Sequence, residues 1–190
     1  MSQGDGFIRR LRRCRVIQLA RQLEQDRSGT TAIEFAMVGL PFFMFLFGIF
    51  GLGLYFFTTF SLENAVEQAS RLIRVGLVQQ SGMTATEFKQ EVCKRLPPFV
   101  DCNEKMRVNV QNYADFGSIT APSCTDSQGN LVPPDGTTFR TGGSSEVVLV
   151  TVCYEWDLAG VLPFLKLGNM PNGAALIQAS ATFLTEPYED

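Results

Sequence analysis

The chain has 190 residues, with sixteen Lys/Arg, nineteen Asp/Glu and no histidine. This length suggests about one domain, and the lack of histidine and of any Cys-x-x-Cys spacing leaves a zinc site without support. No serine, lysine or carboxylate stands in a catalytic motif. We therefore predict a protein that is not an enzyme and that uses no cofactor.

The charges are unevenly distributed along the chain. Residues 1–33 hold seven arginines and three acids, whereas residues 61–190 hold nine Lys/Arg and fifteen Asp/Glu. The basic stretch 9–15, "RRLRRCR", could bind nucleic acid or serve as a targeting address. We favour its interpretation as a flank that fixes membrane topology, and we predict no nucleic-acid partner.

An uncharged run follows the basic segment. Residues 35–62 contain no charge and nine of the sixteen phenylalanines. As a helix the run would be about 42 Å long, which exceeds the roughly 30 Å of a bilayer core. Because the arginines precede the run, we expect the N-terminus in the cytoplasm and residues 63–190 outside. A cleaved signal peptide, the alternative, usually has a shorter apolar region. Pro41 should loosen or kink the helix.

Helical spacing continues beyond the apolar run. The apolar residues of 62–77 fall on one face of the predicted helix: Leu62, Val66, Ala69, Ile73 and Gly76/Leu77. On the other face, Glu67 and Arg71 form a favourable i,i+4 pair. The helix should therefore extend outward for about five turns, until "SGM" (81–83) ends it. A second helix should begin at a Thr84-x-x-Glu87 capping box and end at Pro97–Pro98.

Three strands are predicted in the second half of the chain. Residues 106–110 and 176–184 alternate with period two, and 146–156 is apolar on both faces, as a central strand would be. Residues 117–145 read as a long loop, and 156–173 as an apolar connection that turns toward the membrane or a partner. The predicted fold is α+β: a single N-terminal transmembrane helix extends into an amphipathic helix that packs on a small antiparallel sheet, as in pilins.

The cysteines agree with this topology. Cys14 lies on the reducing side, whereas Cys93, Cys102, Cys124 and Cys153 lie on the oxidising side and allow three pairings. We favour Cys93–Cys102, which brackets the two prolines, together with Cys124–Cys153, which would tie the loop to a strand. Free buried thiols in one or both pairs are the alternative.

Residues 28–43, "SGTTAIEFAMVGLPFF", place Gly29 five positions before Glu34, between the basic flank and the apolar run. This pattern resembles the prepilin signal of class III pilins, and the start of the TadE-like family, pseudopilins of the tight-adherence (Flp pilus) system. Four outer segments are similar to the same family: "VCKRLPPFVDC", "RVNVQNYADF", "VVLVTVCYEW" and "ASATFLTEPY". The similarity covers residues 28–113 and 145–188.

The resemblance implies cleavage by a prepilin peptidase after Gly29, which would make Thr30 the new N-terminus. Glu34 would then be the fifth residue of the mature chain, and its carboxylate would pair with the N-terminal ammonium of a neighbouring subunit. The alternative is an unprocessed single-pass membrane anchor whose extracytoplasmic domain binds a protein partner, and in which Glu34 is a simple acid near a helix N-terminus.

The resemblance also implies the organisation and the partners of the protein. Residues 1–29 would be a cytoplasmic leader, 30–62 the transmembrane helix and 63–190 a periplasmic pilin-like domain. The expected location is the bacterial inner membrane, and the expected role is pilus biogenesis for cell adhesion. The expected partners are membrane lipid, other pilins or pseudopilins, the inner-membrane assembly platform and the prepilin peptidase.

Overall fold

The structure is a computed structural model that describes residues 28–188. The chain divides into two compact units, Met1–Phe47 and Gly48–Asp190. The basic leader up to Arg27, with Cys14, lies outside the described residues. The described part of the first unit is entirely helical, and the second unit holds all the strands.

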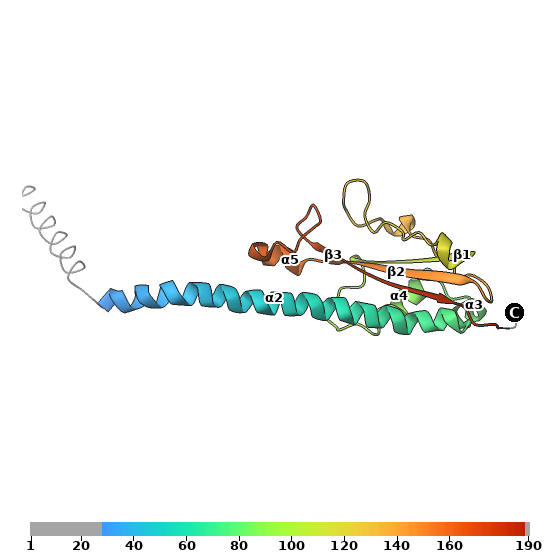
Figure 1. Ribbon diagram of the computed structural model, residues 1–190, viewed down its shortest axis with the longest axis horizontal. Helices are drawn as coiled ribbons and strands as arrows, with labels where there is room; N and C mark the ends of the chain where they lie inside the picture. Colours follow the sequence, from blue (N-terminus) through green and yellow to red (C-terminus); the bar gives the residue numbers. More distant parts are fainter. Residues whose placement is uncertain (1–27, 189–190) are drawn as a thin grey trace, which may run out of the picture. The chain divides into compact units, whose positions relative to one another are not determined.

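The longest element is the helix α2, Ser28–Arg74 (Figure 1). It is the one helix among the described residues that is long and apolar enough to cross a membrane. The chain remains helical on both sides of Pro41, because proline in an apolar helix removes one hydrogen bond but leaves the neighbouring ones intact.

The sheet has three strands, β1 Met106–Tyr113, β2 Val147–Trp156 and β3 Ala175–Leu184, in the order β1-β2-β3 with both pairs antiparallel. The central strand β2 is buried on both faces, and β3 alternates between buried and exposed residues along its length. The predicted fold class is therefore confirmed: one long apolar helix and a small antiparallel sheet.

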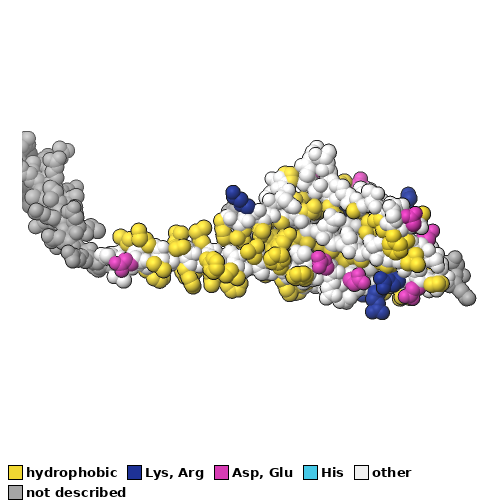
Figure 2. All heavy atoms as spheres, viewed as in Figure 1, with side chains coloured by type: hydrophobic (Ala, Val, Ile, Leu, Met, Phe, Trp, Pro, Cys, Tyr) yellow, Lys and Arg dark blue, Asp and Glu magenta, His cyan; other side chains and the backbone are white. Residues whose placement is uncertain are grey.

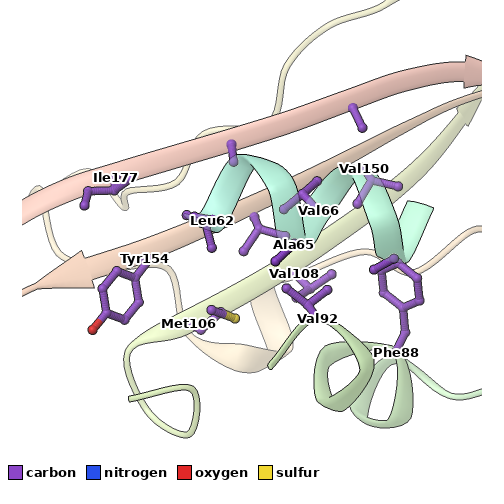
Figure 3. Close-up of a cluster of buried hydrophobic side chains, with 14 of the residues drawn as sticks. Leu62, Ala65, Val66, Phe88, Val92, Met106, Val108, Val150, Tyr154 and Ile177 are labelled. Atoms are coloured by element: carbon purple, nitrogen blue, oxygen red, sulfur yellow. The ribbon is translucent and has the colours of Figure 1, made fainter. Parts of the chain in front are cut away.

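A hydrophobic core joins α2 to one face of the sheet (Figure 3). Leu62, Ala65 and Val66 of α2 are buried together with Val150 and Ile177 of the sheet. The same α2 face continues through Ala69 and Ile73, at the spacing that the sequence predicted. At about 1.5–3 kcal/mol for each large side chain, this burial is the main force that holds the outer part of α2 on the sheet.

The helix α2 ends earlier than predicted. Gly76 adopts a left-handed conformation with φ 78°, and the short helix α3, Leu77–Ser81, begins after it. The predicted uninterrupted helix to residue 81 was therefore wrong at this point. The reason is local, because a left-handed glycine just past the last turn ends a helix, and the Gly76 N–H donates to the Ile73 carbonyl at 3.0 Å. The ring of Tyr188 then occupies the space that a Cβ at Gly76 would need.

The helix α4, Ala85–Cys93, begins at the predicted capping box. The Thr84 hydroxyl accepts a hydrogen bond from the Glu87 backbone N–H, and the Glu87 carboxylate accepts one from the Thr84 backbone N–H at 2.8 Å. The Glu87 carboxylate also accepts a hydrogen bond from the Thr84 hydroxyl at 2.8 Å. The two bonds that the carboxylate accepts, first the one from the Thr84 backbone N–H, lower the pKa of Glu87 from its usual value. Phe88 and Val92 of α4 complete the core shared with α2 and the sheet.

The loop 117–145 covers the other face of the sheet. The loop begins within the short 3₁₀ helix η1, Phe116–Ser118, and contains a second one, η2, Pro134–Gly136. It then returns to the outer edge of β1. There the Val110 N–H donates a hydrogen bond to the Thr138 carbonyl at 2.7 Å, and the Val110 carbonyl accepts one from the Arg140 N–H at 2.8 Å. After β2 the chain forms the helix α5, Leu158–Val161, and the 3₁₀ helix η3, Pro163–Leu165.

Candidate functional site

The predicted site residues Gly29, Thr30 and Glu34 all lie in the first turns of α2 and are exposed. Thr30 and Glu34 are four residues apart in a helix, so they lie on the same face. A Cβ added at Gly29 would meet nothing within 4 Å. Within residues 28–188 Glu34 makes no ion pair or hydrogen bond, and its carboxylate is therefore available to a group from outside this part of the chain.

Large apolar side chains cover the part of α2 in the first unit, and all except the half-buried Leu46 are exposed (Figure 2). There are ten of them: Ile33, Phe35, Met37, Val38, Leu40, Phe42, Phe43, Met44, Phe45 and Phe47. Leaving one such side chain in water instead of burying it costs about 1.5–3 kcal/mol. Ten of them reach or exceed the about 5–15 kcal/mol by which a typical domain is stable. This part of α2 therefore requires an apolar surrounding.

In the second unit one face of α2 is covered by protein. The covered positions follow the helical repeat through Gly48, Gly51, Thr58 and Leu62. The two threonine hydroxyls in this region bond within the helix, since Thr58 donates to the Leu54 carbonyl at 2.8 Å and Thr59 to the Tyr55 carbonyl at 2.9 Å. Such internal bonds remove the cost of placing a hydroxyl among apolar groups.

The four cysteines of the outer domain lie in the two favoured pairs. Cys93 and Cys102 have Cα atoms 6.0 Å apart, and Cys124 and Cys153 have Cα atoms 5.7 Å apart; both pairs are bonded in the structure. These separations are typical of disulfides. The first bond ties the end of α4 to the loop before β1, and the second fixes the 117–145 loop to the central strand.

The acids near the end of β2 are engaged in structural contacts. Glu155 accepts a hydrogen bond from Asn172 at 2.6 Å, and Asp157 forms an ion pair with Lys105. Within the described residues, no three His, Cys, Asp or Glu side chains gather where they could hold a metal ion. The acids at the end of β2 thus hold neighbouring segments of the domain together.

Sequence reasoning missed the junction between the C-terminal tail and the end of α2. Glu186 donates its backbone N–H to the Arg74 carbonyl at 2.7 Å, and the Arg74 guanidinium lies 5.2 Å from the centre of the Phe183 ring. The fully buried Thr185 hydroxyl accepts from the Glu146 N–H at 2.9 Å and donates to the Gly143 carbonyl at 2.7 Å. The tail therefore caps the helix that carries the apolar surface.

Comparison with known proteins gives one match. The model of the family described as TadE-like protein matches residues 29–71, which is most of α2. The resemblance predicted from the sequence is confirmed over this segment. No curated protein and no solved structure matches the chain.

Proposed function

We propose that this chain, which is TadE-like from residue 29 to residue 71, is a structural protein of Flp-type (tight-adherence) pilus assembly. It acts as a minor pilin or pseudopilin, by packing α2 among the helices of other subunits in the membrane. The family is one of pilus assembly and is not known for catalysis, in agreement with a chain that serves as a component and not as an enzyme.

The observation that carries this proposal is the uncovered apolar surface of α2 together with the single carboxylate Glu34. In the first unit the apolar side chains point in all directions around the helix, without a polar face. A helix that is apolar all round is typical of a membrane span or of the centre of a helical assembly. A pilin uses the same helix in both settings, first in the bilayer and then among its neighbours.

Glu34 supplies the specific contact in this scheme. An unpaired carboxylate among lipid chains or apolar helices costs several kcal/mol, and a partner ammonium offsets much of that cost. Cleavage after Gly29 would create such an ammonium on Thr30, one turn before Glu34 on the same face. When a new subunit is inserted, its Glu34 pairs with the Thr30 ammonium of a neighbour, and this pairing sets the axial register of the two helices.

The remaining parts of the chain follow from this role. Residues 1–29 form the cytoplasmic leader that the prepilin peptidase removes, 30–62 the span of the inner membrane and 63–190 the periplasmic domain. The outer domain is held rigidly on α2 by the core around Leu62 and by the tail that caps Arg74. It presents its surface to other pilins and to the inner-membrane assembly platform whenever the helices pack.

The mature N-terminus tests this assignment against an unprocessed membrane anchor. The chain is isolated from its native membrane and analysed by mass spectrometry, with and without an active prepilin peptidase in the cell. We expect a mature chain that begins at Thr30, and the intact chain when the peptidase is absent. A Gly29→Leu variant should keep its leader, whereas its matched control Gly53→Leu should be processed normally, because a Cβ at either position meets nothing within 4 Å. An intact leader in cells with active peptidase would identify the anchor.

A further inference from the structure

We infer that the apolar segment, defined as residues 158–165 with α5 and η3, lies in the outer leaflet of the membrane that α2 crosses and contacts lipid acyl chains. The inference rests on the proposed function only in taking α2 as a membrane span. It concerns a second element of the outer domain, which reaches below the membrane surface beside that span.

The apolar segment packs on α2 at two glycines. A Cβ added at Gly48 would lie 3.6 Å from Leu165 Cδ2 and 3.8 Å from Phe164 Cε2. One added at Gly51 would overlap Leu162 Cδ1 and would lie 2.9 Å from Leu165 Cδ1. Because Gly48 and Gly51 have no side chains, the apolar segment packs directly against the α2 backbone at these two positions, which we call the seat. Small residues allow such close approach between elements in membranes.

The position of these glycines sets the depth of the segment. A bilayer core of roughly 30 Å corresponds to about 20 helical residues, whereas the uncharged run 35–62 has 28. Every window of about 20 residues within that run contains residues 43–54. Gly48 and Gly51 thus lie within the hydrocarbon core for every span that is contained in the uncharged run, and the side chains that pack on them lie there too.

The chemistry of the apolar segment fits this depth. Leu158, Val161 and Phe164 are 42%, 70% and 43% exposed, and residues 158–165 contain no charge. The first charge after the segment is Lys166, whose long side chain can reach the headgroups while its stem stays among apolar groups.

An aromatic pair indicates where the membrane surface lies relative to the apolar segment. The rings of Tyr55, on α2, and Trp156, at the end of β2, have centroids 5.5 Å apart. Tyrosine and tryptophan are enriched where a membrane meets water. With this pair at the surface, the contacts at Gly48 and Gly51 lie one to two helical turns below it.

Photolabelling of the wild-type chain tests the inference. The full chain is reconstituted at low density in phosphatidylcholine vesicles that contain a lipid with a photoreactive group on its acyl chain. Labelled peptides are then mapped by mass spectrometry. We expect adducts on the exposed face of α2 and on residues 158–165. No adduct is expected near Phe116, which is 57% exposed but lies in η1, just after the end of β1 that pairs with Val147, at the opposite end of β2 from Trp156.

Two outcomes would overturn the inference, and they are distinguishable. Adducts on α2 without any on 158–165 would show that the segment does not face lipid. A lack of adducts on α2 itself would instead show that the helix does not span, and the proposed function would fail with it.

A matched pair of variants gives a second readout. Phe164→Trp and Phe116→Trp are each placed in a Trp156→Phe background, which leaves one tryptophan in the chain. Lipids brominated near the headgroup end of the acyl chains should quench the emission of the first variant and leave that of the second unchanged. Equal emission of the Phe164→Trp variant in brominated and plain vesicles would contradict the inference.

Discussion

Replacement of Gly76 by alanine should destabilise the outer domain much more than the same change at Gly82. Both glycines end or begin a short helix in the left-handed region, with φ 78° and 64°. They differ in their surroundings: a Cβ at Gly76 would lie 2.5 Å and 2.7 Å from two ring carbons of Tyr188, whereas one at Gly82 would meet nothing within 4 Å. Gly82 is thus a matched control for the backbone conformation.

The magnitudes follow from these contacts. Alanine in the left-handed region costs about 1–2 kcal/mol, and the smaller entropy of the unfolded alanine chain adds back about 0.4–1 kcal/mol; both variants share these effects. Gly76→Ala must also displace the Tyr188 ring, at about 1–3 kcal/mol for overpacking. It also weakens the Glu186–Arg74 bond, worth about 0.5–1.5 kcal/mol. We therefore expect losses of about 1 kcal/mol for Gly82→Ala and about 2–4 kcal/mol for Gly76→Ala.

The assay is urea unfolding of the full chain in detergent micelles, followed by the emission of the buried Trp156, the only tryptophan. The free energy of unfolding is compared between the two glycine variants, alone and with Tyr188→Ala. Once the ring is removed, Gly76→Ala should cost no more than Gly82→Ala, because the two effects are coupled through one contact. Equal losses for the two glycines with Tyr188 present would refute the role assigned to the tail.

Two further predictions concern the outer domain. Removal of the Cys124–Cys153 disulfide, whose cysteines are 29 residues apart, should lower the free energy of unfolding by about 3.5 kcal/mol. Removal of the Cys93–Cys102 disulfide, whose cysteines are 9 residues apart, should lower it by about 2.5 kcal/mol. Non-reducing peptide mapping checks the two pairs themselves, and a crossed pairing would contradict the prediction. The Glu146 carboxylate accepts hydrogen bonds from the Asn112 side chain and the Gly143 N–H, which hold its pKa below the usual value. A lowered pKa stabilises the fold above the unfolded pKa of about 4.3, and that stability is lost as the pH falls through the folded value. The Glu146→Gln variant should therefore lose less stability than wild type between neutral pH and a pH of about 3. If urea unfolding shows the same fall in the free energy of unfolding for both proteins over this pH range, the prediction is contradicted.

Local patterns were sufficient to predict much of the fold. The apolar positions at helical spacing from Leu62 to Ile73, the capping box at Thr84 and the alternation in β3 all describe neighbours in sequence, and the structure confirms them. The candidate site residues Gly29 and Glu34 also come from a local pattern, their spacing relative to the basic flank and the uncharged run, and their role stays a prediction.

The features that the sequence did not predict depend on contacts between distant segments. The packing of the Tyr188 ring on Gly76 joins two residues that are more than a hundred positions apart in the chain. The pairing of Val110 with residues 138–140 depends on the path of a loop that has no period of its own. The seat at Gly48 and Gly51 exists only because the connection after β2 folds back on α2, and the glycines alone are equally compatible with a helix dimer.

The measurement that tests the central claim most directly is the number of surface pili in cells whose only copy of this protein carries Glu34→Gln. The matched control is Glu63→Gln, an exposed acid at the opposite end of the uncharged run. We predict that both variants insert in the membrane at wild-type levels, that Glu63→Gln cells carry normal pili and that Glu34→Gln cells carry none, because only Glu34 pairs with a neighbouring N-terminus. Normal pili on Glu34→Gln cells would contradict the account.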